Sequence, residues 1–286
     1  LACSHATTRR LHFPFADPKR VLQALPFELE DKVPIPLEQL VRSEECFVTE
    51  QGETEVLNIL ASREEVAERL QEFRAAHAEP RFLGVEGAVI GNLAKFLRLG
   101  ESTQCVIDLG HSDTVVTLLR QWRPMFVRSI PVAGRHFTEE IARDLDISFD
   151  EAEIHKHEHG IFGTDAGSGS ERARRAFDLL AREIRRTGEG LRGWLGGAMP
   201  TEALLIGGSS KMTGLEEELS RRTGLPCHGL RVAPGERGQS LLASAGTADF
   251  AGASALALGG PRSTRSANLN LRSGEFRYRP DLSQLR

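Results

Sequence analysis

Several features that mark common protein classes are scarce in this 286-residue sequence. Its four cysteines lie far apart and form no C-x-x-C pair, which argues against a disulfide scaffold or zinc finger and fits a reducing compartment. The most apolar stretch, 241–260, is built mainly of Ala, Gly and Ser and contains Asp249, so it is a poor membrane span. An excess of positive charge is also absent: 36 Lys and Arg stand against 40 Asp and Glu. This balance argues against a dedicated nucleic-acid binder.

The remaining composition is that of an ordinary soluble globular protein. Hydrophobic residues make up 40% of the chain and charged residues 27%. The length favours about two domains. No signal peptide is visible, and the first residue is Leu rather than Met, so we expect a fragment whose true start is missing.

The first 85 residues alternate between strand-like and helix-like patterns. Apolar residues at Val21, Leu25 and Leu29 predict a helix, which Pro26 interrupts. The sequence Ser62-Arg-Glu-Glu65 has the form of a capping box and predicts a second helix start. The predicted elements, in order, are a strand at 10–13, a helix at 17–30, an extended segment at 37–48, a strand at 54–61, a helix from 62 and a strand at 81–85. This order is the β-α-β-β-α-β pattern of ferredoxin-like units.

Three strands are predicted next, at 105–109, 114–120 and 125–131. Because only tight turns separate them, neighbouring strands must be antiparallel and form a meander. Helical patterns follow at 138–145 and at 171–195, and between them Ser148-Phe-Asp-Glu151 is a second capping box that predicts a helix to about 157. A buried strand at 202–206, a capped helix and a short strand after Pro226 complete the predicted elements.

Asp108-Leu-Gly110-His-Ser-Asp-Thr114 lies between the first two strands of the meander and has the form D-x-G-x-x-x-T. Such a hairpin suits phosphate binding, because a carboxylate can hold Mg²⁺ through water and a glycine lets backbone amides approach phosphate oxygens. Thr114 would complete the contact with its hydroxyl. An ordinary polar turn explains the same residues equally simply.

A second candidate bend is Gly207-Gly208-Ser-Ser210, between the strand at 202–206 and a capped helix. A strand, a glycine pair and a helix N-terminus allow backbone to lie flat against a ligand, with the helix dipole available to anions. By itself this is also a plain strand-to-helix turn. The sequence therefore predicts one site built from Asp108, Gly110, Thr114, Gly207, Gly208 and Ser210.

Together, the two bends resemble the second phosphate loop and the adenosine loop of the superfamily of actin, hexokinase and Hsp70. The runs Pro-Phe-Glu-Leu-Glu-Asp-Lys-Val-Pro-Ile-Pro at 26–36 and Arg-Ser-Ile-Pro-Val-Ala-Gly at 128–134 are similar to segments of the bacterial PilM and GspL proteins. So are Gly-Gly-x-Ser-x-x-x-Gly-Leu at 207–215 and Asn-Leu-Asn-Leu-Arg-Ser-Gly-Glu-Phe at 268–276. The resemblance spans nearly the whole chain.

The resemblance implies an α/β, bilobed actin-like (ASKHA, RNase H-like) fold with an inserted ferredoxin-like βαββαβ subdomain and an N-terminal strand hairpin missing or truncated. The implied division has four parts. They are the inserted subdomain at 1–85, a connecting helix at 86–103, the second lobe at 104–267 with helices at 146–200, and a basic tail of juxtamembrane type at 268–286.

The resemblance also implies a role on the cytoplasmic face of the bacterial inner membrane. The first hypothesis is a non-catalytic, GspL-like scaffold of a type II secretion system. Its implied partners are the N-terminal domain of a GspE-like secretion or pilus ATPase and platform proteins of the GspM, GspF or PilN kind, with a homodimer left open. From 262 to 286, six Arg stand against two acidic residues, which suits a segment before a membrane helix and favours GspL over PilM.

The second hypothesis is a PilM-like switch that closes on ATP and Mg²⁺, with Asp108 holding the metal through water. Family members with a working nucleotide site carry a first phosphate loop, and nothing like it precedes Thr7. A triphosphate held from one side would lose several contacts of about 0.5–1.5 kcal/mol each. We therefore expect no cofactor and a degenerate site. A sugar or acetate kinase of the same superfamily is a more remote alternative.

Overall fold

The computed structural model describes residues 1–163, 169–195, 197–231, 248–259 and 269–279. The helices are η1 (Cys3–His5), α1 (Pro18–Glu30), η2 (Leu37–Gln39), α2 (Arg63–Ala75), α3 (Ile90–Phe96), α4 (Gly134–Leu145), α5 (Phe149–His159), α6 (Glu171–Leu195), η3 (Gly208–Lys211), α7 (Leu215–Thr223), α9 (Ala251–Leu258) and η4 (Gly274–Phe276). The strands are β1 (Thr7–Phe13), β2 (Leu40–Val48), β3 (Thr54–Ser62), β4 (Gln104–Leu109), β5 (Thr114–Arg120), β6 (Arg123–Ile130), β7 (Ala203–Ile206) and β8 (Cys227–Gly229).

The first part of the chain forms a three-stranded antiparallel sheet with the order β1-β3-β2. The predicted stripe of Val21, Leu25 and Leu29 packs on one face of this sheet, so α1 covers that face. Asp17 caps α1 by accepting hydrogen bonds from two backbone amides of its first turn, and Pro26 lies inside the helix. The helix that follows the capping box at Ser62 begins at Arg63, and Ser62 accepts from the Glu65 amide.

The predicted strand at 81–85 is wrong: these residues join no sheet. Leu83 pairs instead with the C-terminal segment, because its amide donates to Asn270 Oδ1 and its carbonyl accepts from the Leu271 amide, each over 2.9 Å. The subdomain is therefore β-α-β-β-α, and a segment from the far end of the sequence pairs with the residues that were expected to form its sixth element.

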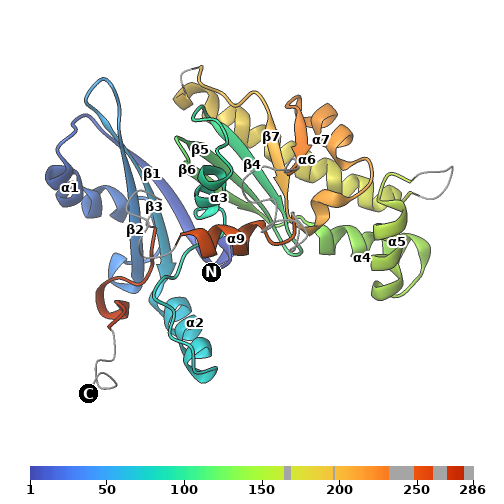
Figure 1. Cartoon of the computed structure of the whole chain (residues 1–286), viewed down its shortest axis with the longest axis horizontal. Helices are drawn as coiled ribbons and strands as arrows, with labels where there is room; N and C mark the ends of the chain where they lie inside the picture. Colours follow the sequence, from blue (N-terminus) through green and yellow to red (C-terminus); the bar gives the residue numbers. More distant parts are fainter. Residues whose placement is uncertain (164–168, 196, 232–247, 260–268, 280–286) are drawn as a thin grey trace.

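The second sheet has five strands in the order β6-β5-β4-β7-β8. Strands β4, β5 and β6 form the predicted antiparallel meander, whereas β7 and β8 run parallel to β4. Side chains of α4, α6 and α7 pack on one face of this sheet. Helices α3 and α9 cover part of the other face, and the three-stranded sheet packs beside them (Figure 1).

The predicted basic tail also needs correction over its described part, 269–279. Leu269 and Leu271 are fully buried in a cluster that includes residues of β3 and α2. The Arg272 side chain is also buried, and it pairs with Glu79 at 2.6 Å. These residues belong to the core of the three-stranded half, in one cluster with Leu83 and Val85. Within the described ranges, no helix has the length and apolar character to cross a membrane.

Candidate functional site

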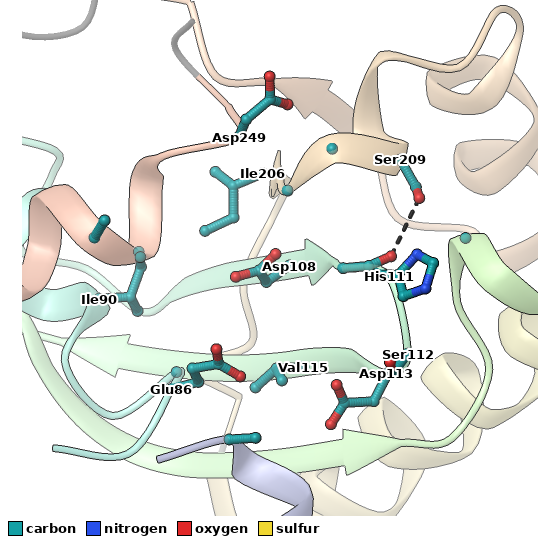
Figure 2. Close-up of a pocket in the computed structure, with 18 of the residues that line it drawn as sticks. Glu86, Ile90, Asp108, His111, Ser112, Asp113, Val115, Ile206, Ser209 and Asp249 are labelled. Atoms are coloured by element: carbon teal, nitrogen blue, oxygen red, sulfur yellow. Dashed lines mark hydrogen bonds between the residues drawn. The ribbon is translucent and has the colours of Figure 1, made fainter. Parts of the chain in front are cut away.

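A cavity of about 810 Å³ opens where β4 and β7 end, at the carboxyl ends of two neighbouring parallel strands (Figure 2). Crevices outside the carboxyl ends of strands are the usual ligand sites of open α/β sheets. The remaining walls come from η1, residues 86–90, the start of α4, one side of α5, and residues 249–256.

The first predicted bend forms one side of the cavity floor. The Gly110 amide donates to Asp113 O at 3.2 Å and closes the turn between β4 and β5. The Gly110 carbonyl accepts from the Gly134 amide at 3.1 Å and from Ser209 Oγ at 3.2 Å (Figure 2). The second of these contacts joins the two predicted bends directly.

The second bend begins at Gly207, which has a φ of +87°. A Cβ atom at this position would lie 2.3 Å from Asp108 Oδ1 and 2.5 Å from Leu109 O. Only glycine therefore allows the end of β7 to pass this close to β4. The two bends lie side by side on one sheet edge, 99 residues apart at the Ser209–Gly110 contact.

Four of the six predicted site residues line the cavity: Asp108, Gly110, Gly207 and Gly208. Thr114 does not, because it pairs with Leu109 and points with it to the opposite face, where its hydroxyl donates to Val132 O at 2.7 Å. Ser210 does not either, because it is buried and its hydroxyl donates to Gly207 O at 2.7 Å, inside the turn. Whether the lining residues bind a ligand remains a prediction.

The structure adds charged residues that the motifs did not reveal. Glu86 and Asp113 extend toward the same space as Asp108 (Figure 2), and Glu153, Lys156 and Asp249 also line the cavity. Glu153 and Lys156 are three residues apart on a predicted helix, so they lie on one face of it. This spacing could have identified them as an ion pair from the sequence. Glu86 and Asp249 come from segments without a motif, so nothing in the sequence pointed to them.

Carboxylates dominate the electrostatics of the floor. Burial, together with the charges of Glu86 and Asp113, raises the pKa of Asp108 from 3.8 to about 6. Burial and the charge of Asp113 likewise raise the pKa of Glu86 above its usual value. Asp113 accepts a hydrogen bond from Ser129 Oγ at 2.6 Å. The floor is therefore a place where negative charge is costly and where a cation would be stabilised.

Both lysines that line the cavity are paired with acids. Lys211 forms an ion pair with Asp249. Lys156 is buried, and its Nζ donates to the Glu153 carboxylate at 2.7 and 2.9 Å and to Thr138 Oγ1 at 2.8 Å. Burial raises the pKa of Glu153, but the hydrogen bonds from Lys156 and Thr138 outweigh burial, so the pKa lies below its usual value.

This arrangement suits a hydrated divalent cation better than a bare anion. In the described part of the chain, no three acidic, His or Cys side chains lie close enough to hold a metal ion between them. A Mg²⁺ ion beside Asp108 would therefore need water or ligand oxygens, as Mg²⁺ commonly does. The donor set and the glycine-lined floor fit Mg²⁺ with a phosphorylated ligand, whose charge the ion would balance.

Comparison with known proteins identifies the class of fold as actin-like. The structure of a PilM-PilN type IV pilus biogenesis complex is similar over 89% of this chain and 76% of that chain, with 28% sequence identity and a TM-score of 0.71. A lower similarity exists to the cytoplasmic domain of EpsL, an inner-membrane component of the type II secretion system of Vibrio cholerae, with 12% identity, coverage of 46% and 48%, and a TM-score of 0.36.

The family described as cell division protein FtsA matches residues 105–256, which is more than half of the sequence. The chain belongs to this family of actin-like proteins. FtsA of Staphylococcus epidermidis is 38% identical over 64 residues, a stretch that covers 22% of this chain and only 14% of that protein. The predicted actin-like fold and the predicted resemblance to domains of the PilM and GspL kind are confirmed.

Proposed function

We propose that this chain is a non-catalytic scaffold domain of an inner-membrane platform, in a type IV pilus or a type II secretion machine. The observation that carries this proposal is the similarity to PilM in complex with PilN, which extends over 89% of the chain and so includes both sheets. The proposed partners are a PilN-like membrane protein and the N-terminal domain of a GspE-like ATPase.

The choice between GspL and PilM turns on the C-terminal segment. The excess of Arg after 262 favours a GspL-like domain beside a membrane, but Arg272 is buried and paired with Glu79, so it contributes nothing to an exposed basic segment. The platform role that we propose holds whether the chain is GspL-like or PilM-like, and a GspL-like domain is our first hypothesis. A PilM-like role is the alternative.

The platform role is tested by calorimetric titration of the full chain with the PilN protein of the solved complex. We expect saturable binding with a Kd in the micromolar range or tighter, and no binding of a PilN variant in which the segment that contacts PilM in the solved complex is scrambled. Equal heats from native and scrambled sequences would refute the proposal. An assay of phosphate release from ATP runs in parallel, and turnover that Asp108→Asn abolishes would refute the non-catalytic part.

A second candidate function is a nucleotide-dependent switch. The specific observation in its favour is that the two bends meet at one cavity, which contains Asp108 and has the volume of a small-molecule site. ATP with Mg²⁺ would bind there and change the angle between the halves, as ligands do in hinged proteins.

Calorimetry with ATP and Mg²⁺ separates the two functions. Micromolar binding that is lost in Asp108→Asn and kept in Asp31→Asn, which changes an exposed carboxylate at the end of α1, would establish the switch. Binding weaker than millimolar in the parent chain and in both variants would exclude the switch, and the scaffold role would remain.

A further inference from the structure

A second, smaller hollow of about 280 Å³ lies on the three-stranded half, between the C-terminal end of α1, the start of β2 and the C-terminal segment. We call it the α1–β2 groove. Its walls are mainly apolar and include Leu37, Leu40, Leu60 and Phe276, with Arg42 and Arg63 among them. It is remote in sequence from the bends of the larger cavity.

The register of the sheet explains why apolar and charged residues meet here. Arg42 pairs with Leu60 on the neighbouring strand, so both point to the face that α1 covers. Leu40 is partly buried against the cluster that α1 covers, and Leu40 and Arg42 both line the groove at the start of β2.

The two arginines of the groove differ in their partners. Arg63 donates to Glu38 O and forms an ion pair with Glu275, so the chain supplies its own carboxylate there. The half-buried Arg42 guanidinium has no hydrogen bond or ion pair with any described residue, although its backbone carbonyl accepts from Ser273 Oγ. A guanidinium offers five donors in a planar fork that matches a carboxylate.

Apolar surface continues outside the groove. Phe27 follows Pro26, which lines the groove, and 74% of Phe27 is exposed. Ile35, close before the groove residue Leu37, is 41% exposed. Exposed apolar residues beside an open hollow are typical of protein interaction sites.

The surrounding charges select the kind of partner. The last turn of α1 and its end carry Glu28, Glu30 and Asp31, all exposed. Lys32 pairs with Glu28, so Glu30 and Asp31 give this border a small negative excess. That excess disfavours the dense negative charge of an anionic membrane or a nucleic acid, whereas one unpaired Arg inside an apolar groove matches a single carboxylate next to apolar side chains.

We propose that the α1–β2 groove is a docking site for a partner peptide that packs an apolar side chain against Leu37, Leu40 and Phe276, which are partly exposed, and presents a neighbouring carboxylate to Arg42. The proposal does not depend on the platform role or on nucleotide binding. It assigns to the three-stranded half a recognition function of its own, separate from the cavity at Asp108.

The test uses the full chain and a fluorescein-labelled peptide of sequence Leu-Asp-Leu-Leu-Asp-Leu, with binding followed by fluorescence anisotropy. We expect saturable binding that weakens at least tenfold in Arg42→Glu and in Leu37→Ser. Arg182→Glu makes the same charge change at an exposed site on α6 and should leave binding unchanged. Urea unfolding of each variant verifies that the fold is kept.

A second peptide, in which Asn replaces both Asp residues, completes a cycle. The parent chain should bind this peptide at least tenfold more weakly than it binds the acidic peptide. Arg42→Glu should bind the Asn peptide as tightly as the parent chain does. Three results would overturn the proposal: no saturable binding of the acidic peptide up to millimolar concentration, equal losses in Arg42→Glu and Arg182→Glu, or Arg42-dependent binding to phosphatidylserine vesicles without binding to the peptide.

Discussion

Gly207 combines a positive φ with close contacts to the backbone and side chain of β4 at the cavity beside Asp108. Its backbone angles, φ 87° and ψ 162°, lie in a region that only glycine adopts readily, and a Cβ would collide with Asp108 and Leu109. We expect Gly207→Ala to lower the free energy of unfolding by about 2–5 kcal/mol, from backbone strain and overpacking together. Urea denaturation measures the loss.

Gly224 provides the matched control. It also has a positive φ, of 72°, but nothing lies within 4 Å of a Cβ placed there. Gly224→Ala should therefore cost only the backbone strain, about 1 kcal/mol. Equal losses in the two variants would mean that the bends do not approach each other as closely as described.

The carboxyl group of Asp108 predicts a pH dependence of stability. Its pKa is raised to about 6 in the folded chain, so the folded state binds this proton more tightly than the unfolded state, whose pKa is near 3.8. The stabilisation that the bound proton gives is present below about pH 4 and is lost as pH rises through 6. At pH 7.5, Asp108→Asn should raise the free energy of unfolding by about 1–3 kcal/mol.

At pH 4 the same substitution should change stability little, because Asp108 is then neutral in the folded chain. Unfolding curves at both pH values check the prediction, and Asp31→Asn serves as the exposed control. A gain of the same size at both pH values would show that the effect comes from packing and not from charge.

At the level of elements, the sequence predicted structure that depends on local patterns but not structure that depends on long-range pairing. Three local features were predictable because each depends on neighbours in sequence. They are the meander, predicted at 105–131 and found at 104–130, the helix starts at Ser62 and Ser148, and the apolar stripe of α6. Side chains alternate between the two faces of a strand, and this alternation turns Thr114 away from the cavity. The sequence pattern of β5 could therefore have excluded Thr114 from the predicted site. The pairing of Leu83 with Leu271 joins residues 188 apart, and no local signal marks it.

The C-terminal segment is an element of the core, and Leu271 is its central contact. Leu271 is fully buried, and its amide donates to Leu83 O. We expect Leu271→Ala to lower the free energy of unfolding by about 2–5 kcal/mol. Hydrogen exchange of the Leu83 amide, which Asn270 holds, should become faster in the variant.

Leu179→Ala is the control for this substitution, because Leu179 lies on α6 and is 43% exposed. Its cost should stay below about 1 kcal/mol. If Leu271→Ala were as mild as this control, with unchanged exchange at Leu83, the segment would not belong to the core.

At the scale of the whole molecule, polar contacts join the three-stranded half to the five-stranded half. Thr8 Oγ1 donates to Val127 O at 2.7 Å, and Arg123 pairs with Glu45 and donates to Cys46 O at 2.7 Å. Burial raises the pKa of Glu45 above its usual value, although Arg123 opposes the shift. The halves also share a buried apolar cluster, in which Val115 and Val127 of the five-stranded sheet pack with residues of β3 and α2.

Arg10 and Trp194 form the most specific of these contacts. The Arg10 guanidinium lies 3.6 Å from the centre of the Trp194 ring and so joins β1 to the C-terminal end of α6. We expect Arg10→Ala to lower stability by about 0.5–2 kcal/mol, the range of cation–π contacts. Because the ring then loses its cover and meets water, the emission of Trp194 should move to longer wavelength.

The measurement needs a chain in which Trp194 is the only tryptophan, which Trp122→Phe provides because the sequence contains two. Arg9→Ala in the same background is the matched control, since Arg9 is the neighbour of Arg10 on β1 but donates to Lys32 O and Thr8 O. An unchanged emission in Arg10→Ala, or the same change in Arg9→Ala, would exclude Arg10–Trp194 as a contact between the halves. A change confined to Arg10→Ala would make Trp194 a reporter of the angle between them, so that a nucleotide which closes the cavity at Asp108 should alter its emission.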